Sequence, residues 1–278
     1  MTLTKPLQKS LPHIILLVYV AIILFPFVFV LFSSLKADNV EISQAPFAFP
    51  TKLYFQNYVD AWVQAKIGTY FLNSAYLALS SAVVGVLVAA GTAFALTRMK
   101  FRITSKMVYG LVLIGMLIPG NVLFIAQYKL MMDLSILNTH WSLFLPYTAG
   151  ALPFSVLLIS AFMKSIPSEL EEAAIMDGLS AVGLFARIIL PLTIPALVTV
   201  FIINFLGNWN EYLLANFFIS KDALRTLPTG MVGFRDAYQT NYALISTGIV
   251  FSVTPVIVMY SVLQKQIIEG LTAGSVKG

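Results

Sequence analysis

The sequence has no cysteine and few charged residues for its length. The absence of cysteine among 278 residues excludes disulfides, thiolate chemistry and cysteine-based zinc or iron–sulfur sites. Only 10% of the residues are charged, whereas 59% are hydrophobic; soluble domains average about 25% charged and about 45–50% apolar. So few charges cannot cover that much apolar surface in water. The sequence therefore predicts a protein whose solvent is mostly lipid.

Several functional motifs are also missing. No Gly-Lys pair occurs, so the chain has no phosphate-binding G-x-x-x-x-G-K-[ST] loop for ATP. It has no H-E-x-x-H, no G-x-S-x-G and no paired membrane aspartates, which argues against an intramembrane hydrolase. The net charge of +5 forms no dense basic run, so nucleic acid is not expected as a partner. His13 and His140 have no ligand-like neighbours, and we expect no metal site and no enzyme activity.

The apolar stretches predict an all-α, polytopic membrane protein. A helix needs about 20 apolar residues to cross the hydrocarbon layer, and six stretches without Asp, Glu, Lys or Arg reach that length. The expected spans are 14–34, 70–96, 107–128, 141–163, 188–210 and 243–264. In the second span, Ser81, Gly85, Ala89 and Ala93 recur every four residues, which predicts a flat stripe for close helix packing.

The positive charges predict the orientation of the spans. Arg98, Lys100, Arg102 and Lys106 lie between the second and third spans with no acid among them. Short loops rich in Lys and Arg stay on the cytoplasmic side. With six spans, both termini are then cytoplasmic as well. None of the spans carries an ionisable residue at its centre, which argues against proton coupling.

The cytoplasmic stretch 165–187 predicts a helix–turn–helix outside the bilayer. Ser168 and Glu171 have the spacing of a capping box at a helix start. Gly178 suits the left-handed turn that ends a helix, and Ser180 can start a second short helix. The acids of this stretch lie beside an anionic leaflet and gain nothing from it. They fit a segment that projects into a protein partner; a solvated acidic loop is the alternative.

One pattern in this stretch resembles the EAA signature of ABC importer permeases. Glu172-Ala173-Ala174 is followed after three residues by Gly178 and after nine more by Ile188-x-Leu190-Pro191. The pattern stands between the fourth and fifth of six spans, as in that family. The resemblance implies that the stretch is a coupling helix that docks on a separate ATPase subunit. The implied coupling residues are Glu169, Glu172, Ala173, Ala174, Asp177, Gly178, Ile188, Leu190 and Pro191.

Two further stretches resemble the MalG-type permease subunit of carbohydrate ABC importers. Asn208-Trp209-Asn210-Glu211-Tyr212-Leu213-Leu214, followed by Thr226-Leu227-Pro228, is similar to the sugar-uptake branch. The last nine residues are similar to the tail of that subunit, with Ser275 where a small apolar residue is commoner. The resemblance implies the type I importer fold, with tail residues that reach the ATPase subunits and outer-loop residues that contact a binding protein. These are Gly274, Lys277 and Gly278, and Tyr238, Gln239 and Asn241, respectively.

The resemblance also implies the partners and the location. They are a homologous second permease, two ATP-binding subunits that hold ATP-Mg, an extracytoplasmic solute-binding protein, a sugar substrate and the membrane. The chain would be a multi-pass protein of a bacterial or archaeal cytoplasmic membrane, with no cofactor of its own. A facilitated carrier or channel without ATPase partners is the alternative, and it leaves the acidic helix–turn–helix unexplained.

The sugar path is expected to be neutral and polar. Asn204, Asn208 and Glu211 share one face of the fifth span, where they could hydrogen-bond a sugar or equally well join helices. Trp209 is either an interfacial anchor or a sugar-stacking ring. Pro119-Gly120-Asn121 breaks the third span, either as a packed kink or as a cavity lining. The path candidates are Asn121, Asn204, Asn208, Trp209, Asn210 and Glu211.

The chain is expected to divide into three parts. Residues 1–66 hold the N-terminal tail, the first span and an outer loop. Residues 67–265 form the transport core with five helices and the coupling loop, and residues 266–278 form a cytoplasmic tail.

Overall fold

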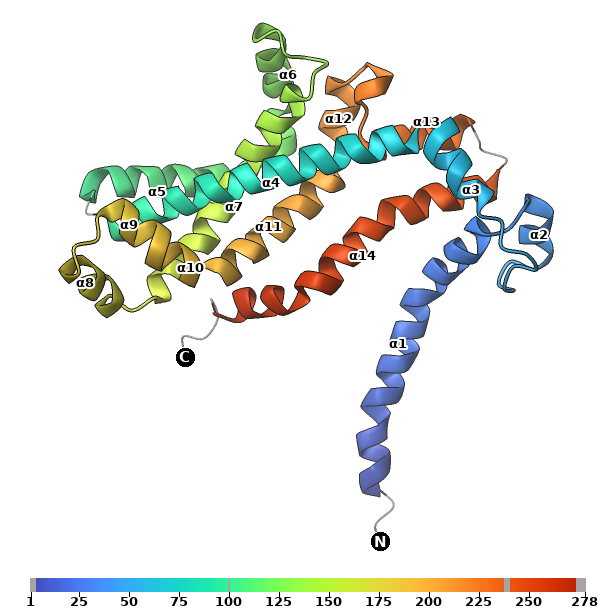
Figure 1. The fold of residues 1–278 in the computed structure, drawn as a ribbon, viewed down its shortest axis with the longest axis horizontal. Coiled ribbons are helices and arrows are strands. Elements are labelled where there is room, and N and C mark those ends of the chain that lie inside the picture. Colours follow the sequence, from blue (N-terminus) through green and yellow to red (C-terminus); the bar gives the residue numbers. More distant parts are fainter. Residues whose placement is uncertain (1–3, 100, 238–240, 274–278) are drawn as a thin grey trace. The chain divides into compact units, whose positions relative to one another are not determined.

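The computed structural model describes residues 4–99, 101–237 and 241–273, and every regular element in those ranges is helical (Figure 1). The long helices are α1 (Thr4–Ser34), α4 (Ile67–Arg98), α5 (Arg102–Leu117), α7 (Trp141–Ser165), α11 (Ile194–Trp209) and α14 (Tyr242–Ala273). The shorter α-helices are α2 (Asn39–Gln44), α3 (Gln56–Val59), α6 (Phe124–Asp133), α8 (Glu169–Met176), α9 (Ala181–Leu184), α10 (Leu190–Leu192), α12 (Leu213–Phe218) and α13 (Leu227–Ala237). Single π or 3₁₀ turns complete the chain: η1 (Asp60–Gln64), η2 (Gly120–Leu123), η3 (Phe185–Ile189) and η4 (Asp222–Leu224).

The predicted all-helical membrane fold is confirmed. Within the residues that the structure describes, four helical segments are long and apolar enough to cross a membrane: Pro12–Ser34, Ile67–Arg98, Trp141–Ser165 and Tyr242–Gln266. Two bent helix pairs, Ile103–Leu117 with Gly120–Asp133 and Ala181–Leu192 with Ile194–Trp209, raise the number to six if each pair is one span.

The third and fifth predicted spans are not single helices. α5 ends at Leu117, and the chain turns by 92° before α6; the break falls at Pro119, as the sequence indicated, because proline cannot continue the hydrogen-bond ladder. The fifth span was expected over 188–210, but a 74° bend precedes α11. Here Thr193 caps α10, and Pro195 stands at the start of α11, where a missing N–H costs nothing.

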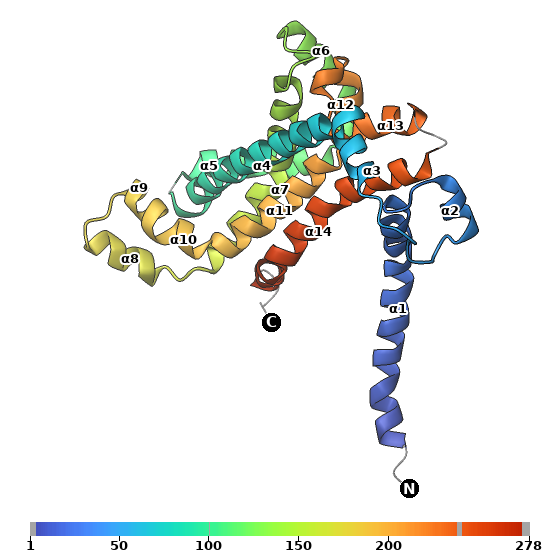
Figure 2. The ribbon, with the colours of Figure 1, turned by 45° about the vertical axis from the view of Figure 1, so that its right-hand side comes forward.

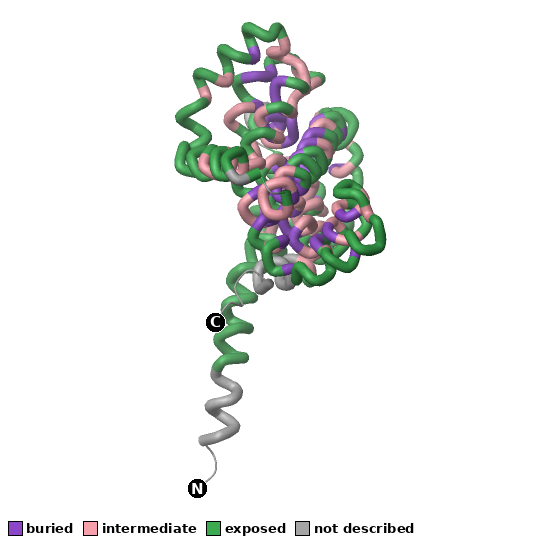
Figure 3. The backbone as a smooth tube through the Cα atoms, turned by 90° about the vertical axis from the view of Figure 1, so that its left-hand side faces the viewer, coloured by how far each residue is buried: buried purple, intermediate pink, exposed green. Residues whose placement is uncertain are grey.

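The described chain forms two compact units. One comprises the residues up to Gly68 with Gly230–Thr254, and the other comprises Thr69–Thr229 with the residues from Pro255 onward. In the first unit α1 shows apolar side chains on all sides, and most of its described length is exposed (Figure 3). A helix that is apolar all round needs lipid or other helices around it.

The stretch after α1 in the first unit is well ordered by polar contacts. The side chain of Lys36 is fully buried, and its ammonium donates to the Ala45 and Pro46 carbonyls at 2.6 and 3.3 Å. Asn57 donates to the carbonyls of Ser34 and Lys36. The ammonium therefore hydrogen-bonds carbonyls just beyond the C-terminal end of α2, and it shares the Ala45 carbonyl with the Ala48 N–H.

The second unit is built around α4, α7 and α11 (Figures 1 and 2). All four members of the small-residue stripe on α4, Ser81, Gly85, Ala89 and Ala93, are buried. A Cβ added to Gly85 would lie 3.7 Å from the carbonyl oxygen of Thr148 in α7. The stripe thus admits a neighbouring backbone at close range, as predicted.

Candidate functional site

The candidate site is the helix–turn–helix formed by α8 and α9. α7 ends at Ser165, Ile166 is extended, and α8 begins at Glu169. The capping box expected from Ser168 and Glu171 does not form. Ser168 has helical dihedral angles (φ −68°, ψ −22°), and its side chain makes no capping hydrogen bond. A serine caps with its side chain when its backbone is extended, so here only the Ser168 carbonyl serves the helix start.

The turn after α8 is the one that the glycine predicts. Gly178 has φ +81°, a left-handed conformation that costs an ordinary residue about 1–2 kcal/mol. The N–H of Gly178 donates to the Ile175 carbonyl, and the N–H of Leu179 donates to the Ala174 carbonyl. These two bonds make a Schellman motif. Ser180 then caps α9, accepting from the Gly183 N–H at 3.3 Å, as the sequence indicated.

An arginine at the end of α4 holds this site to the rest of the unit. The Nε of Arg98 lies 2.8 Å from Oε1 of Glu171, and the two side chains are only 13% and 15% exposed. The same guanidinium donates to the carbonyls of Met163, at 2.6 Å, and Ile166, at 3.0 Å. One guanidinium thereby joins the ends of α4 and α7 to α8.

Apolar contacts complete the attachment. Ala174 is 5% exposed and Leu184 is 6% exposed, and both belong to the main apolar core of the unit, together with Ile189. The ring of Phe185 packs on Phe94 with centroids 5.0 Å apart. The inner face of the helix–turn–helix is therefore fixed by packing, while its outer face is free to carry other side chains.

The outer face combines acids and large apolar groups. Glu169, Glu172, Ala173, Asp177 and Gly178 are exposed. Between them, the following apolar side chains are 46–86% exposed: Leu170, Ile175, Met176 and, from α9, Val182. Of the remaining motif residues, Ile188 and Leu190 are half-buried and Pro191 is exposed. A contiguous mixture of this kind is typical of a protein contact surface.

Sequence reasoning missed the two residues that anchor the site. Arg98 was counted only as a positive charge that sets topology, and Glu171 was assigned to a capping box. The spacing of Glu171 and Ala174, i and i+3, places both on one helix face. Small size alone did not identify that face, because Ala173 is as small as Ala174 and is exposed.

The path candidates on α11 are joined to neighbouring helices. The Asn204 amide donates to Ser155 of α7 at 3.1 Å, and the Asn208 amide donates to Ser81 of α4 at 2.8 Å. Asn204 is 6% exposed, whereas Asn208 is half-buried. Both bonds join neighbouring helices, which is one of the two roles that the sequence suggested for these amides. A role for these amides in a sugar path stays a prediction.

The remaining path candidates lie in different surroundings. Trp209 is 2% exposed and stacks on Phe205, with Phe71 against its edge. Glu211 accepts from the Tyr147 hydroxyl at 2.7 Å and from the Leu214 and Ala215 N–H groups that open α12. Two candidates, Asn121 and Asn210, are exposed.

The outer-loop and tail candidates are mostly outside the described residues. This applies to Tyr238, Gln239, Gly274, Lys277 and Gly278. Asn241 is described, and its side-chain oxygen accepts from the Leu244 N–H at the start of α14. In the described part of the chain, no group of three or more His, Asp or Glu side chains is arranged to hold a metal ion.

Comparisons with known proteins agree with this architecture. The family described as binding-protein-dependent transport system inner membrane component matches residues 81–271, and the chain belongs to this family. It is 35% identical to a probable ABC transporter permease of Bacillus subtilis, covering 95% of this chain and 87% of the relative. It is 32% identical to a diacetylchitobiose uptake system permease of Streptomyces coelicolor, covering 96% and 88%. A crystal structure of a bacterial ABC transporter involved in alginate import contains a chain with TM-score 0.82 at 21% identity, covering 95% and 98%.

Proposed function

We propose that this chain is the permease subunit of an ATP-driven importer that moves a sugar or oligosaccharide across the cytoplasmic membrane, with both termini in the cytoplasm. Its partners are a second, homologous permease, two ATP-binding subunits and an extracytoplasmic solute-binding protein. ATP-Mg is bound and hydrolysed by the ATP-binding subunits, so the chain itself is not an enzyme. The uptake of diacetylchitobiose by a relative supports a carbohydrate as the substrate class.

The observation that carries the proposal is the two-sided helix α8. Its inner side is fixed by the Arg98–Glu171 ion pair and by buried Ala174. Its outer side presents exposed acids together with Met176, which is 86% exposed. A helix held rigidly to the transmembrane core and open on its far side is suited to pass motion between a partner and that core. The exposed face is the surface that would seat in a groove of the ATP-binding subunit.

Because the chain has no cysteine, a single introduced thiol can test by crosslinking whether α8 contacts the ATP-binding subunit. A Met176→Cys variant has one thiol in this chain, to which a photoactivatable maleimide is attached in the assembled complex. The matched control is Ile125→Cys on α6, a position that is 78% exposed. We expect crosslinks to the ATP-binding subunit from position 176 and none from position 125. Equal crosslinking from both, or from neither, contradicts a docking role for α8.

Transport in vesicles separates this function from a facilitated carrier. Vesicles that contain the whole complex and the binding protein should accumulate sugar only when ATP is supplied. Vesicles that contain this chain alone should take up none. Sugar uptake by the chain alone would refute the proposed mechanism.

A further inference from the structure

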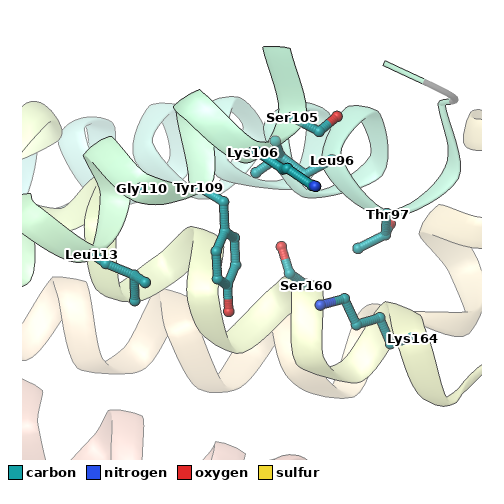
Figure 4. Close-up of a pocket in the computed structure, with 9 residues that line it drawn as sticks. All are labelled: Leu96, Thr97, Ser105, Lys106, Tyr109, Gly110, Leu113, Ser160 and Lys164. Atoms are coloured by element: carbon teal, nitrogen blue, oxygen red, sulfur yellow. The ribbon is translucent and has the colours of Figure 1, made fainter. Parts of the chain in front are cut away.

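A pocket of about 370 Å³ lies between α4, α5 and α7 (Figure 4). Lys106 of α5 and Lys164 of α7 line it, and none of the residues that line it is acidic. The ammonium of Lys164 lies 5.3 Å from the ring centroid of Tyr109, a cation–π distance that orients the charge. Two lysines without a nearby carboxylate in the lining make the pocket attractive to an anion.

A buried hydroxyl without a partner points into the same pocket. Ser160 is 1% exposed, and its Oγ is buried and makes no hydrogen bond with the described residues. Figure 4 shows its side chain directed into the space between Tyr109 and Lys164. Buried hydroxyls are almost always hydrogen-bonded. An oxygen atom of a bound molecule would supply the acceptor that the Ser160 hydroxyl lacks.

The pocket also has an apolar wall. Leu96 and Leu113 line it, and α5 exposes the apolar side chains of Met107, Leu111 and Ile114 by 54–65%. The pocket therefore presents a basic, hydroxyl-bearing side together with a wall suited to hydrocarbon. A lipid fits both parts of this pocket, because its acyl chain covers the apolar wall. A free inorganic anion would contact the basic side and leave the apolar wall uncovered.

We propose that this pocket binds one anionic phospholipid. The phosphate lies between the ammonium groups of Lys106 and Lys164, the Ser160 hydroxyl donates to a headgroup or glycerol oxygen, and an acyl chain lies along Leu96 and Leu113. Basic pockets between transmembrane helices are suited to such headgroups.

The site adjoins the anchor of the helix–turn–helix along the chain. Thr97, which also lines the pocket, precedes Arg98, and Lys164 lies between the residues whose carbonyls accept from the Arg98 guanidinium, Met163 and Ile166. A lipid bound here would contact the same ends of α4 and α7 that carry α8.

Native mass spectrometry of the purified full-length chain tests the site without transport, ATP hydrolysis or partner subunits, so the result does not depend on the proposed function. The protein is titrated with phosphatidylglycerol and, separately, with phosphatidylcholine. The test variant is Lys106→Gln/Lys164→Gln, and the control is Lys52→Gln/Lys129→Gln, which removes two exposed lysines elsewhere. A lysine near an anionic lipid changes affinity about fivefold, so the test variant should bind phosphatidylglycerol about 25-fold more weakly. The control should bind it as the wild type does.

Two further measurements test the hydrogen bond from Ser160 and the contribution of the acyl chain. Ser160→Ala should weaken phosphatidylglycerol binding about fivefold, because it removes one hydrogen bond while both lysines, and so the charge of the pocket, stay unchanged. Inorganic phosphate should compete at least about tenfold more weakly than the lipid, since it lacks the acyl chain. The proposal is overturned if the double lysine variant retains wild-type binding, if phosphatidylcholine binds equally well, or if inorganic phosphate competes as strongly as the lipid.

Discussion

The guanidinium of Arg98 reaches Glu171 across 2.8 Å, from the last residue of α4 to the first turn of α8. The two residues are 73 positions apart in the sequence (171 minus 98). Arg98 also donates to two carbonyls at the end of α7. The ion pair and these two hydrogen bonds are the polar contacts that attach α8, the candidate coupling helix, to the ends of α4 and α7.

Breaking the ion pair should loosen α8 without unfolding the protein. Glu171→Gln removes the charge, and because both partners are mostly shielded from solvent, we expect a loss of about 1–3 kcal/mol in the stability of this segment. Hydrogen exchange of the α8 amides should then rise about 5- to 150-fold. Glu169→Gln is the matched control on the same helix, since Glu169 is exposed. Equal exchange in both variants would show that the pair does not anchor α8.

The turn at Gly178 should be sensitive to side-chain shape rather than to size. Space around the residue is open, but its φ of +81° disfavours a β-branched side chain by about 1–2 kcal/mol. Gly178→Val should insert normally and lose sugar-stimulated ATP hydrolysis, because the docking surface is misplaced. Gly178→Asn tolerates the left-handed region and should retain most of the activity. Full activity of the valine variant would contradict a coupling role for this turn.

The sequence predicted where the apolar helical segments lie, but it did not predict the side-chain contacts that anchor α8 and the stretch after α1. Apolar runs identify transmembrane segments because each run must satisfy its own backbone in lipid. The Schellman turn was also accessible, because Gly178 and its neighbours form it locally. The partner of Glu171 was not, since local spacing offered Ser168 and nothing in the sequence joins residue 171 to residue 98. The burial of Lys36 was not predictable either, because it depends on the irregular fold of the chain after α2, which brings the Ala45 and Pro46 carbonyls to its ammonium.

Reversing the charge of Glu172 should weaken docking without affecting folding. Glu172 is exposed on α8, so Glu172→Lys changes the outer surface while leaving the Glu171 anchor in place. We expect normal insertion, weaker recovery of the ATP-binding subunit in a pull-down, and reduced stimulated hydrolysis. Asp133→Lys makes the same charge change at an exposed position, the last residue of α6, and should have no effect. A docking role is refuted if the two reversals behave alike.

The segment around α2 should lose stability in acid. The Thr51 N–H is the main cause that lowers the pKa of Glu41 below 4.5, helped by the Thr51 hydroxyl and the Ala37 N–H. A carboxylate with a lowered pKa contributes stability that is present above the unfolded pKa and is lost as the pH falls through the folded pKa. The protection of the α2 amides against hydrogen exchange, measured relative to the intrinsic exchange rate at each pH, should therefore fall below about pH 4.5.

Glu41→Gln is the variant that isolates this contribution. It cannot ionise, so the protection of the α2 amides in the variant should already be low at neutral pH and should change little between about pH 6 and about pH 3. Asp60→Gln, at a site that also bears side-chain hydrogen bonds in the same unit, should leave the acid dependence of α2 intact. A Glu41→Gln protein with the wild-type acid dependence would assign the effect to another group.

Alanine variants of the two amide residues of α11 should distinguish a role in helix packing from a role in sugar contact. Asn204 is 6% exposed and bonded to Ser155, so Asn204→Ala should lower stability by about 0.6–1.7 kcal/mol and leave the KM for sugar unchanged. Asn208 is bonded to Ser81 but half-buried, so it retains access to a substrate. Asn208→Ala should raise the KM, because a sugar site loses discrimination when one of its polar partners is removed. Ser81→Ala breaks the same interhelical bond from the other side and serves as the control. If Ser81→Ala and Asn208→Ala change KM equally, the amide acts through helix packing alone.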